Sequence, residues 1–213
     1  ADPITNDHAE SMDDNPAGLG FGESFQLSYA YASGGREKRR TGHGLWTSLR
    51  PLEFFSTGLG VQWLDPQGLR SFAVTEQADE VSRDLSSRWP RKWTWSNTLT
   101  VSPALALGLS WHTVRGASHY DRIDAYDMGL QYRPARWLAL GVTASDLGES
   151  NRLDRRWGLG LGLRPVGEAL TVSGYTEMAD ESRARLFGTR LRWHVWRGMG
   201  LAARFDASHE AGV

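Results

Sequence analysis

About eleven segments of this chain place an apolar residue at every second position, and this alternation constrains the fold more than any other feature. In residues 23–32, for example, Phe25, Leu27 and Tyr29 alternate with small or polar residues. Successive side chains of a β-strand point to opposite faces of a sheet, whereas a helix would scatter the same residues around its axis. The alternation therefore predicts an all-β protein whose strands each have one apolar face.

The connections between these segments alternate between tight turns and longer polar loops. Short turns at one end and long loops at the other are typical of up-and-down barrels in bacterial outer membranes, where the tight turns face the periplasm. We therefore predict an antiparallel up-and-down transmembrane β-barrel of about 10–12 strands over residues 23–213, in the bacterial outer membrane with a periplasmic amino terminus. The tight turns are expected at Leu49–Pro51, Val101–Pro103, Tyr132–Pro134, Leu163–Pro165 and Trp196–Gly198, and the long loops at residues 34–41, 65–91, 115–122, 145–155 and 177–185.

The face opposite the apolar one consists mainly of Gly, Ala, Ser and Thr, with few Lys or Glu. A soluble β-sandwich would bury its apolar face and carry charged residues on the solvated one. A face of small residues instead suits the lumen of a narrow barrel whose apolar face contacts the lipid bilayer. This hypothesis requires Leu107, Leu130, Leu140 and Leu161 to point away from the barrel axis. If they converge inward, the protein is a soluble β-barrel or sandwich.

The composition excludes several classes of protein. A formal net charge of −1 disfavours nucleic acid as a partner, because nucleic-acid-binding domains carry a clustered basic surplus. The chain has no cysteine, so neither disulfides nor thiolate metal sites form. No run approaches the roughly 20 apolar residues of a transmembrane helix. The negative mean hydropathy remains compatible with a barrel, because only one face of each strand is apolar.

The chain contains 10 tryptophans among 213 residues. A membrane interface offers the indole ring both burial and a partner for its N–H group. We therefore predict an aromatic girdle at the strand ends, with burial in a soluble core as the alternative. The interface aromatics are expected to be Trp46, Trp63, Trp93, Trp111, Trp137, Trp157 and Trp196.

Several polar side chains share the alternation of the small residues and are therefore candidates to line the lumen. They would contact a passenger or a plug, or form a structural hydrogen-bond network in the wall. These lumen-facing candidates are Gln26, Gln62, Gln131, Arg133, Arg190, Arg192 and His194.

No arrangement of residues points to an active site. His112, His119 and Asp121 are of metal-ligand type, but their spacing matches no standard site. We predict no catalytic residue, no bound metal and no cofactor, and therefore not an enzyme. The carboxylate pairs Asp13–Asp14 and Asp124–Asp127 are predicted to be solvated loop residues and not an acid–base pair. Gly158, Gly160 and Gly162 have the strand period and no following helix, so they do not form a dinucleotide-binding loop.

Three motifs resemble one family of outer-membrane barrels. They are Asn15–Leu19 (NPAGL), Leu138–Val142 with Ala144–Gly148, and Gly158–Pro165 (GLGLGLRP). Together they resemble the FadL/PorV-type superfamily of long-chain fatty-acid transporters and secretion-associated barrels. They are also similar to the barrel-like amino-terminal region ahead of the signal-peptide-peptidase (SppA, S49) domain of some myxobacterial proteins.

This resemblance implies the organisation and the function to expect. Residues 1–22, acidic and rich in turns, would form an amino-terminal hatch or plug, and residues 23–213 the barrel. FadL-type barrels transport small hydrophobic molecules, so a passenger of this kind in the lumen is the first expectation. The alternatives are a non-transporting barrel that anchors or docks a partner protein, such as a peptidase domain or secreted cargo, and a soluble β-barrel that binds a ligand internally. We expect this chain to lack the peptidase domain of the SppA-like proteins. FadL-type barrels usually have fourteen strands, which is more than this chain offers.

Overall fold

The computed structural model describes residues 7–32, 42–64, 91–116, 123–148, 155–179, 185–196 and 199–209. These residues form two short 3-10 helices, η1 (Ala9–Asp13) and η2 (Pro16–Phe21), followed by a long series of strands. The strands are β1 (Phe25–Ala32), β2 (Gly42–Leu52), β3 (Phe55–Leu64), β4 (Arg91–Ser102), β5 (Leu105–Arg115), β6 (Ile123–Ala135), β7 (Leu138–Leu147), β8 (Arg156–Leu163), β9 (Pro165–Glu168), β10 (Leu170–Ala179), β11 (Arg185–Trp196) and β12 (Met199–His209).

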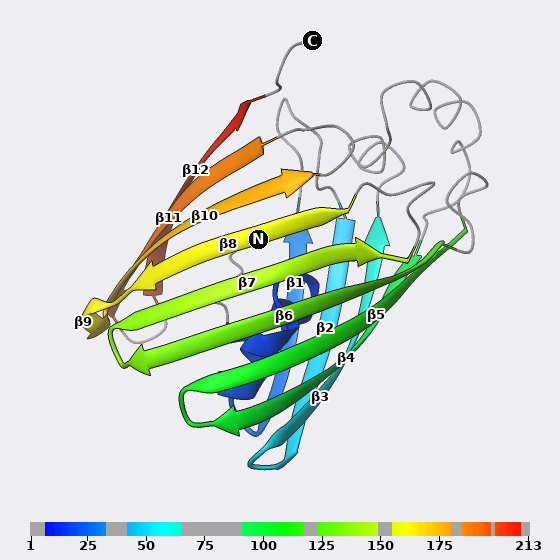
Figure 1. The fold of residues 1–213 in the computed structure, drawn as a ribbon, viewed down its shortest axis with the longest axis horizontal. Coiled ribbons are helices and arrows are strands. Elements are labelled where there is room, and N and C mark those ends of the chain that lie inside the picture. The colour runs from blue at the N-terminus through cyan, green and yellow to red at the C-terminus, as the bar shows by residue number, and fades with distance from the viewer. Residues whose placement is uncertain are drawn as a thin grey trace.

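All strands except the short β9 belong to one sheet of eleven strands, in the order β1 to β8 followed by β10, β11 and β12. Each strand of the sheet pairs antiparallel with its neighbour in this order, so β8 pairs with β10. Figure 1 shows the sheet curving around η1 and η2. The prediction of an all-β, antiparallel up-and-down fold is confirmed, and the strand number lies within the predicted range. Strands β1 and β12 are the two edges, and no pairing joins them among the described residues.

Tight turns follow β2, β4 and β6 as predicted, but two of them are displaced along the chain. At the predicted turn Leu163–Pro165 the short strand β9 follows Arg164, and residues 197–198 of the predicted turn after β11 lie outside the described residues. The turn after β2 is Glu53–Phe54 and the turn after β6 is Arg136–Trp137, each two or three residues later than predicted. Pro51 and Pro134 remain inside the strands, where each falls in a register shift of the ladder. Proline has no N–H to donate and is therefore tolerated in a strand at such a bulge. The middle parts of the predicted long loops lie outside the described residues, but residues 145–147 and 177–179, predicted as loop, belong to β7 and β10.

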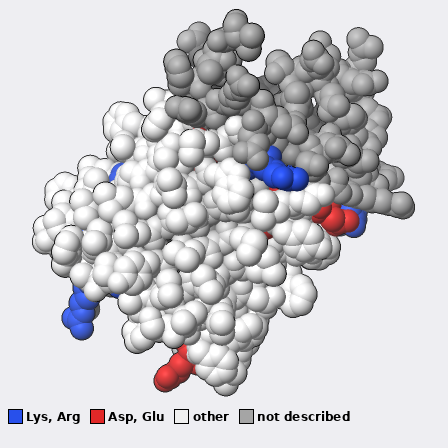
Figure 2. Space-filling model, in the orientation of Figure 1, with Lys and Arg blue, Asp and Glu red and all other residues white. Residues whose placement is uncertain are grey.

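The two faces of the sheet have the chemistry that the lipid hypothesis requires. Leu107, Leu130, Leu140 and Leu161 point away from the enclosed side and are 37–44% exposed. In Figure 2, the charged side chains that can be seen lie near the margins of the described surface, and its middle has none. The enclosed side instead carries buried hydroxyl and small side chains, among them Ser48, Ser56, Thr94, Ser96, Thr98, Ser110 and Ala106. An apolar outer face and a polar inner face are therefore established for the described strands.

Glycines on the enclosed side allow the amino-terminal residues to approach the sheet closely. A Cβ atom at Gly108 of β5 would lie 2.3 Å from the backbone nitrogen of Ala17 and from the carbonyl carbon of Pro16. A Cβ atom at Gly129 of β6 would lie 2.0 Å from Oδ1 of Asn15. Both distances are far below van der Waals contact, so η2 reaches its position only because these two wall residues have no side chain.

Among the described residues, no helix has the length and apolar character needed to cross a membrane.

We expect Gly108→Ala to destabilise the protein by about 1–3 kcal/mol, because the added methyl group overlaps the backbone of η2. The measurement is the midpoint of urea unfolding, together with the rate of proteolytic cleavage within residues 7–22. Gly174→Ala is the matched control, because a Cβ atom at Gly174 meets nothing within 4 Å. Equal stability of the two variants would contradict the close seating of η2.

Candidate functional site

Residues 7–22, here called the internal segment, lie against the enclosed face of the sheet. Helix η1 contacts β1 to β4 and η2 contacts β3 to β6, and Figure 1 shows both helices within the curve of the sheet. Asn15 begins η2: its side chain accepts a hydrogen bond from the backbone N–H of Ala17 at 3.1 Å, and Pro16 occupies the first helical position. Asn15 also donates to the carbonyl of Leu130 at 3.4 Å. The NPAGL motif is thus a helix start that also contacts the wall.

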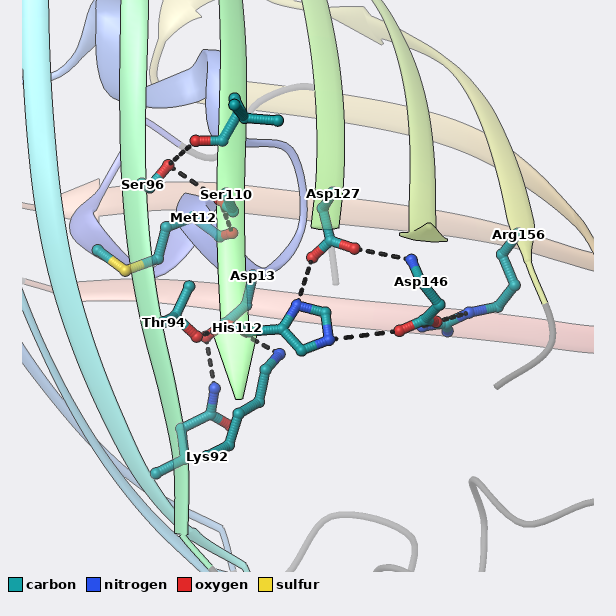
Figure 3. Close-up of polar contacts among 12 residues, drawn as sticks. Met12, Asp13, Lys92, Thr94, Ser96, Ser110, His112, Asp127, Asp146 and Arg156 are labelled. Atoms are coloured by element: carbon teal, nitrogen blue, oxygen red, sulfur yellow. Dashed lines mark hydrogen bonds and ion pairs between the residues drawn. The ribbon is translucent and has the colours of Figure 1, made fainter. Parts of the chain in front are cut away.

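Hydroxyl groups of the wall hold the middle of the internal segment. Thr98 donates to the carbonyl of Pro16 at 2.6 Å, and Ser110 donates to the carbonyl of Met12 at 2.9 Å. Ser110 also lies 2.9 Å from the hydroxyl of Ser96 on the neighbouring strand (Figure 3). Buried backbone carbonyls need hydrogen-bond donors, and these serines and threonines supply them. The small polar face of the sheet is therefore used to bind irregular backbone.

Arginines bind the two ends of the internal segment near the tight turns. Arg50 donates to the carbonyls of Gly20 and Gly22, each at 2.7 Å. Arg133 makes two hydrogen bonds to the carboxylate of Asp7, and Arg164 donates to the same carboxylate at 3.2 Å. The Arg133 guanidinium also lies 4.1 Å from the centroid of the Phe21 ring, a cation–π contact. The segment therefore enters and leaves the enclosed space at the same end.

The carboxylate of Asp13, at the deepest point of the internal segment, accepts hydrogen bonds from three strands. Its donors are Trp46 at 2.6 Å, Gln62 at 2.5 Å, Lys92 at 2.9 Å and Thr94 at 3.0 Å. Burial raises the pKa of Asp13, but the Lys92 ammonium and the hydrogen bonds lower it by more, so the pKa lies below its ordinary value of 3.8. Asp13 is therefore a carboxylate that stays charged inside the protein.

Trp46 is not an interface residue, and this prediction was wrong. The indole ring is buried at 8% exposure among Ala9, Met12 and Leu19, and its N–H donates to Asp13. Alternation along β2 turns Trp46 inward, and Gly60 on β3 leaves room for the ring. Of the other predicted interface aromatics, Trp93, Trp137 and Trp157 are exposed, Trp63 and Trp111 are half-buried, and the side chain of Trp196 lies outside the described residues.

The structure brings three of the lumen-facing candidates onto the internal segment. Gln26 donates to the carbonyl of Asp7 at 3.1 Å, Gln62 binds Asp13, and Arg133 binds Asp7. These contacts are with the internal segment itself. Of the other candidates, Gln131 is fully buried, Arg190 and Arg192 are half-buried on β11, and the side chain of His194 lies outside the described residues.

A second set of polar residues, here called the buried polar cluster, consists of His112, Asp127, Asp146 and Arg156 (Figure 3). The imidazole of His112 lies between the carboxylates, with Nδ1 3.2 Å from Oδ2 of Asp127 and Nε2 3.5 Å from Oδ1 of Asp146. Arg156 donates to Oδ2 of Asp146 from Nε at 2.9 Å and from Nη2 at 2.6 Å. The cluster joins β5, β6, β7 and β8 near the ends that lead to the long loops.

A β-bulge places Asp146 in this cluster. Ser145 and Asp146 of β7 lie opposite Asp127 alone, and Asp146 has a left-handed backbone with φ of 60°. Its backbone N–H donates to Oδ1 of Asp127 at 2.9 Å. Strict alternation from Leu140 and Val142 would have turned Asp146 outward, so the bulge reverses its direction.

The sequence indicates only parts of this cluster. It suggests His112 with His119 and Asp121, which lie outside the described residues, whereas the structure joins His112 to Asp127 and Asp146. Asp124 and Asp127 are not a pair, because Asp124 contacts Arg115 at 3.5 Å at the strand end. Nor are Asp13 and Asp127 solvated loop residues, since both lie inside the sheet. His112, Asp127 and Arg156 each alternate with the outward apolar residues of their strands. This pattern alone predicts that their side chains face the enclosed side.

No model of a known protein family matches the sequence, and no curated protein matches it. Solved structures similar to this chain include variants of the porin of Rhodopseudomonas blastica; two of them have a TM-score of 0.49 and are 14% and 15% identical in sequence. Each match covers 78% of this chain and 50% of the porin chain. The chain thus spans about half the length of these porins, and its function is inferred from its own residues.

We expect Asp13→Asn to lower the free energy of unfolding by about 3 kcal/mol, because it leaves the ammonium of Lys92 buried without its counter-charge. The measurement is urea unfolding in detergent. Asp14→Asn, a neutralisation of the adjacent carboxylate, is the control. Adding Lys92→Met to Asp13→Asn should recover part of the loss, as a double-mutant cycle would show. A loss equal to that of the control would rule out the ion pair as a main anchor.

The stability that Asp13 contributes should depend on pH with a defined sign. Because its folded pKa is lowered, the contribution is complete at neutral pH and is lost as the pH falls below about 4 toward the folded pKa. The difference in melting temperature between the wild type and Asp13→Asn should therefore be constant from pH 7 to 5 and should shrink below about pH 4. A difference that persists unchanged to pH 2 would show that the charge of Asp13 is not what matters.

Proposed function

We propose that this chain is an outer-membrane β-barrel that passes small molecules and is closed by its internal segment. The observation that carries the proposal is the arrangement of the two faces, apolar outward and polar inward. Soluble proteins seldom expose contiguous apolar patches larger than a few hundred Å², yet here every long strand from β1 to β12 exposes large apolar side chains, mostly Leu, Phe, Trp and Tyr, and Val172 and Met178 on β10. Such a surface suits lipid tails, and the strands approach the roughly 9–11 residues of a tilted membrane-crossing strand.

The proposed orientation places the amino terminus on the periplasmic side. In outer-membrane barrels the tight turns face the periplasm and the long loops face outward. Asp7 and Gly22 are both bound by arginines near the tight-turn ends of their strands, while Asp13 lies deeper, toward the long loops. The internal segment would thus enter the lumen from the periplasm and return to it before β1 begins. This supports the assignment of residues 1–22 as a hatch and of residues 23–213 as the barrel.

The proposal also concerns the chemistry of the transported molecule and its route through the barrel. The resemblance to FadL-type barrels implies a hydrophobic passenger, whereas the described wall is rich in serine and threonine hydroxyls, such as Thr171 and Ser173 on β10. The internal segment occupies the space beside β1 to β6, so a passenger would cross after the segment moves, or beside β8 to β11. In either case the protein acts as a barrel and not as an enzyme.

A second candidate function is a non-transporting barrel that anchors a partner protein, as the resemblance to PorV-type and SppA-associated barrels implies. The observation that favours it is the firm seating of the internal segment, which is bound at both ends and in its middle by Arg50, Arg133, Thr98 and Ser110. A permanently filled lumen would support a membrane anchor and no flux.

A reversible lock on the internal segment separates these functions. Cγ of Asn15 lies 3.0 Å from the Cβ position of Gly129, which is about the distance that a disulfide requires between the sulfur of one cysteine and Cβ of the other. Because the natural chain has no cysteine, the pair Asn15→Cys with Gly129→Cys would form a unique bridge. We expect oxidation to reduce solute entry into liposomes at least tenfold and dithiothreitol to restore it.

The solutes tested are a small sugar and a medium-chain fatty acid, and the control variant is Asn15→Ser with Gly129→Ser under the same redox cycle. Equal solute entry in the oxidised and reduced forms would indicate that the solute passes beside the internal segment. No flux of either solute, with or without reductant, would overturn transport and favour the anchor. A protein that stays monodisperse without detergent would overturn the membrane assignment for both functions.

A further inference from the structure

We propose that His112, Asp127 and Asp146 form a binding site for a first-row transition-metal dication at the long-loop end of the enclosed space. Each of the three residues offers one potential ligand atom, and these atoms lie within 4.8 Å of one another. All three residues are buried, on β5, β6 and β7. This site is additional to the proposed transport function and does not depend on it.

The orientation of the two carboxylates is the first argument. Oδ1 of Asp127 accepts the backbone N–H of Asp146, and Oδ2 of Asp146 accepts two hydrogen bonds from Arg156. One oxygen of each carboxylate is thereby fixed, and the other oxygen is turned toward the imidazole of His112 (Figure 3). Metal ligands are commonly held in place by such outer hydrogen bonds. The two free oxygens face different nitrogens of one imidazole, so a metal ion would be bound by both carboxylates once the ring shifts from between them.

The histidine provides an independent argument. His112 is only 4% exposed, and its Nδ1 atom makes no hydrogen bond of acceptable geometry although Oδ2 of Asp127 lies 3.2 Å away. A buried ring nitrogen without an aligned partner is costly. Two ligand atoms that bind one metal at about 2.1 Å lie roughly 3.0–3.4 Å apart, which is close to this spacing. A metal ion would satisfy both atoms.

The charge balance points to a dication. Three carboxylates, Asp127, Asp146 and Glu177, surround one guanidinium, Arg156, whose Nη1 lies 4.0 Å from Glu177. With a neutral imidazole this group has two negative charges in excess, which a dication would balance in full, whereas a protonated imidazole would balance only one of them. Uncompensated charge in a buried site is unfavourable. One nitrogen and two carboxylate oxygens suit Zn²⁺, Mn²⁺, Fe²⁺ or Co²⁺ better than Ca²⁺ or Mg²⁺, which prefer oxygen ligands alone.

The test is isothermal titration of the detergent-solubilised protein, prepared without a polyhistidine tag, with ZnCl₂ and separately with MgCl₂. We expect one Zn²⁺ per chain and at least a hundredfold weaker binding in His112→Gln and in Asp127→Asn. His43→Gln is the matched control, because it removes a histidine that contacts Tyr29 outside the cluster, and it should bind as the wild type does. Absence of Zn²⁺ binding, or binding that survives both substitutions, would overturn the proposal.

A spectroscopic measurement on the wild type keeps the proposal testable if the variants do not fold. Co²⁺ bound at this site should give visible absorption bands, and X-ray absorption of the Zn²⁺ form should show one imidazole among oxygen ligands. A Co²⁺ spectrum identical to that of the ion in buffer, or a Zn²⁺ form with several imidazoles, would contradict the assignment. Both measurements are made in detergent without any solute flux, so their outcome is separate from that of the transport experiment.

Discussion

The arrangement inside this protein depends on hydrogen bonds from wall side chains to the backbone of the internal segment. The sheet uses its own backbone groups for its ladders, so an irregular segment enclosed by it must find partners among side chains. Ser110, Thr98 and Arg50 donate to the carbonyls of Met12, Pro16, Gly20 and Gly22. The abundance of serine and threonine on the enclosed face is thus the counterpart of a chain that passes there without regular structure. Glycines at Gly108 and Gly129 complete the fit by removing steric overlap.

Within the internal segment, Asp7 and Asp13 each have cationic partners in the wall. Asp7 is bound by Arg133 and Arg164 near the tight turns, and Asp13 by Lys92 toward the long loops. Removing one partner of such a pair costs far more than the pair contributes, because the remaining charge stays desolvated. The middle of the segment uses neutral hydroxyl groups instead. The ionic contacts therefore fix the position of the segment along the strands, and the hydroxyl groups fix its distance from the wall.

The strands could be predicted from the sequence because each residue's face follows from its position alone in a regular ladder. The prediction failed where the strands depart from regular alternation or where a residue was assigned by its position in the strand alone. Trp46 was assigned by its position near a strand end, although alternation with Leu45 and Leu49 turns it inward. Asp146 joins His112 only through a bulge, which no local pattern of residues announces. Pro51 and Pro134 lie in bulges and not in the turns themselves. The contacts of Asp13 link residues up to 81 positions apart, so only the folded chain reveals them.

The number of strands in the sheet has a consequence for its two edges. Because eleven strands alternate in direction, β1 and β12 run the same way. An antiparallel ladder between them is excluded by this parity, whatever the curvature of the sheet. Rotation about the barrel axis does not change strand direction. The β1 strand of a second copy rotated in this way would therefore also run parallel to β12. A closed cylinder built on these strands must contain either one parallel seam or an odd number of additional strands inserted between the two edges.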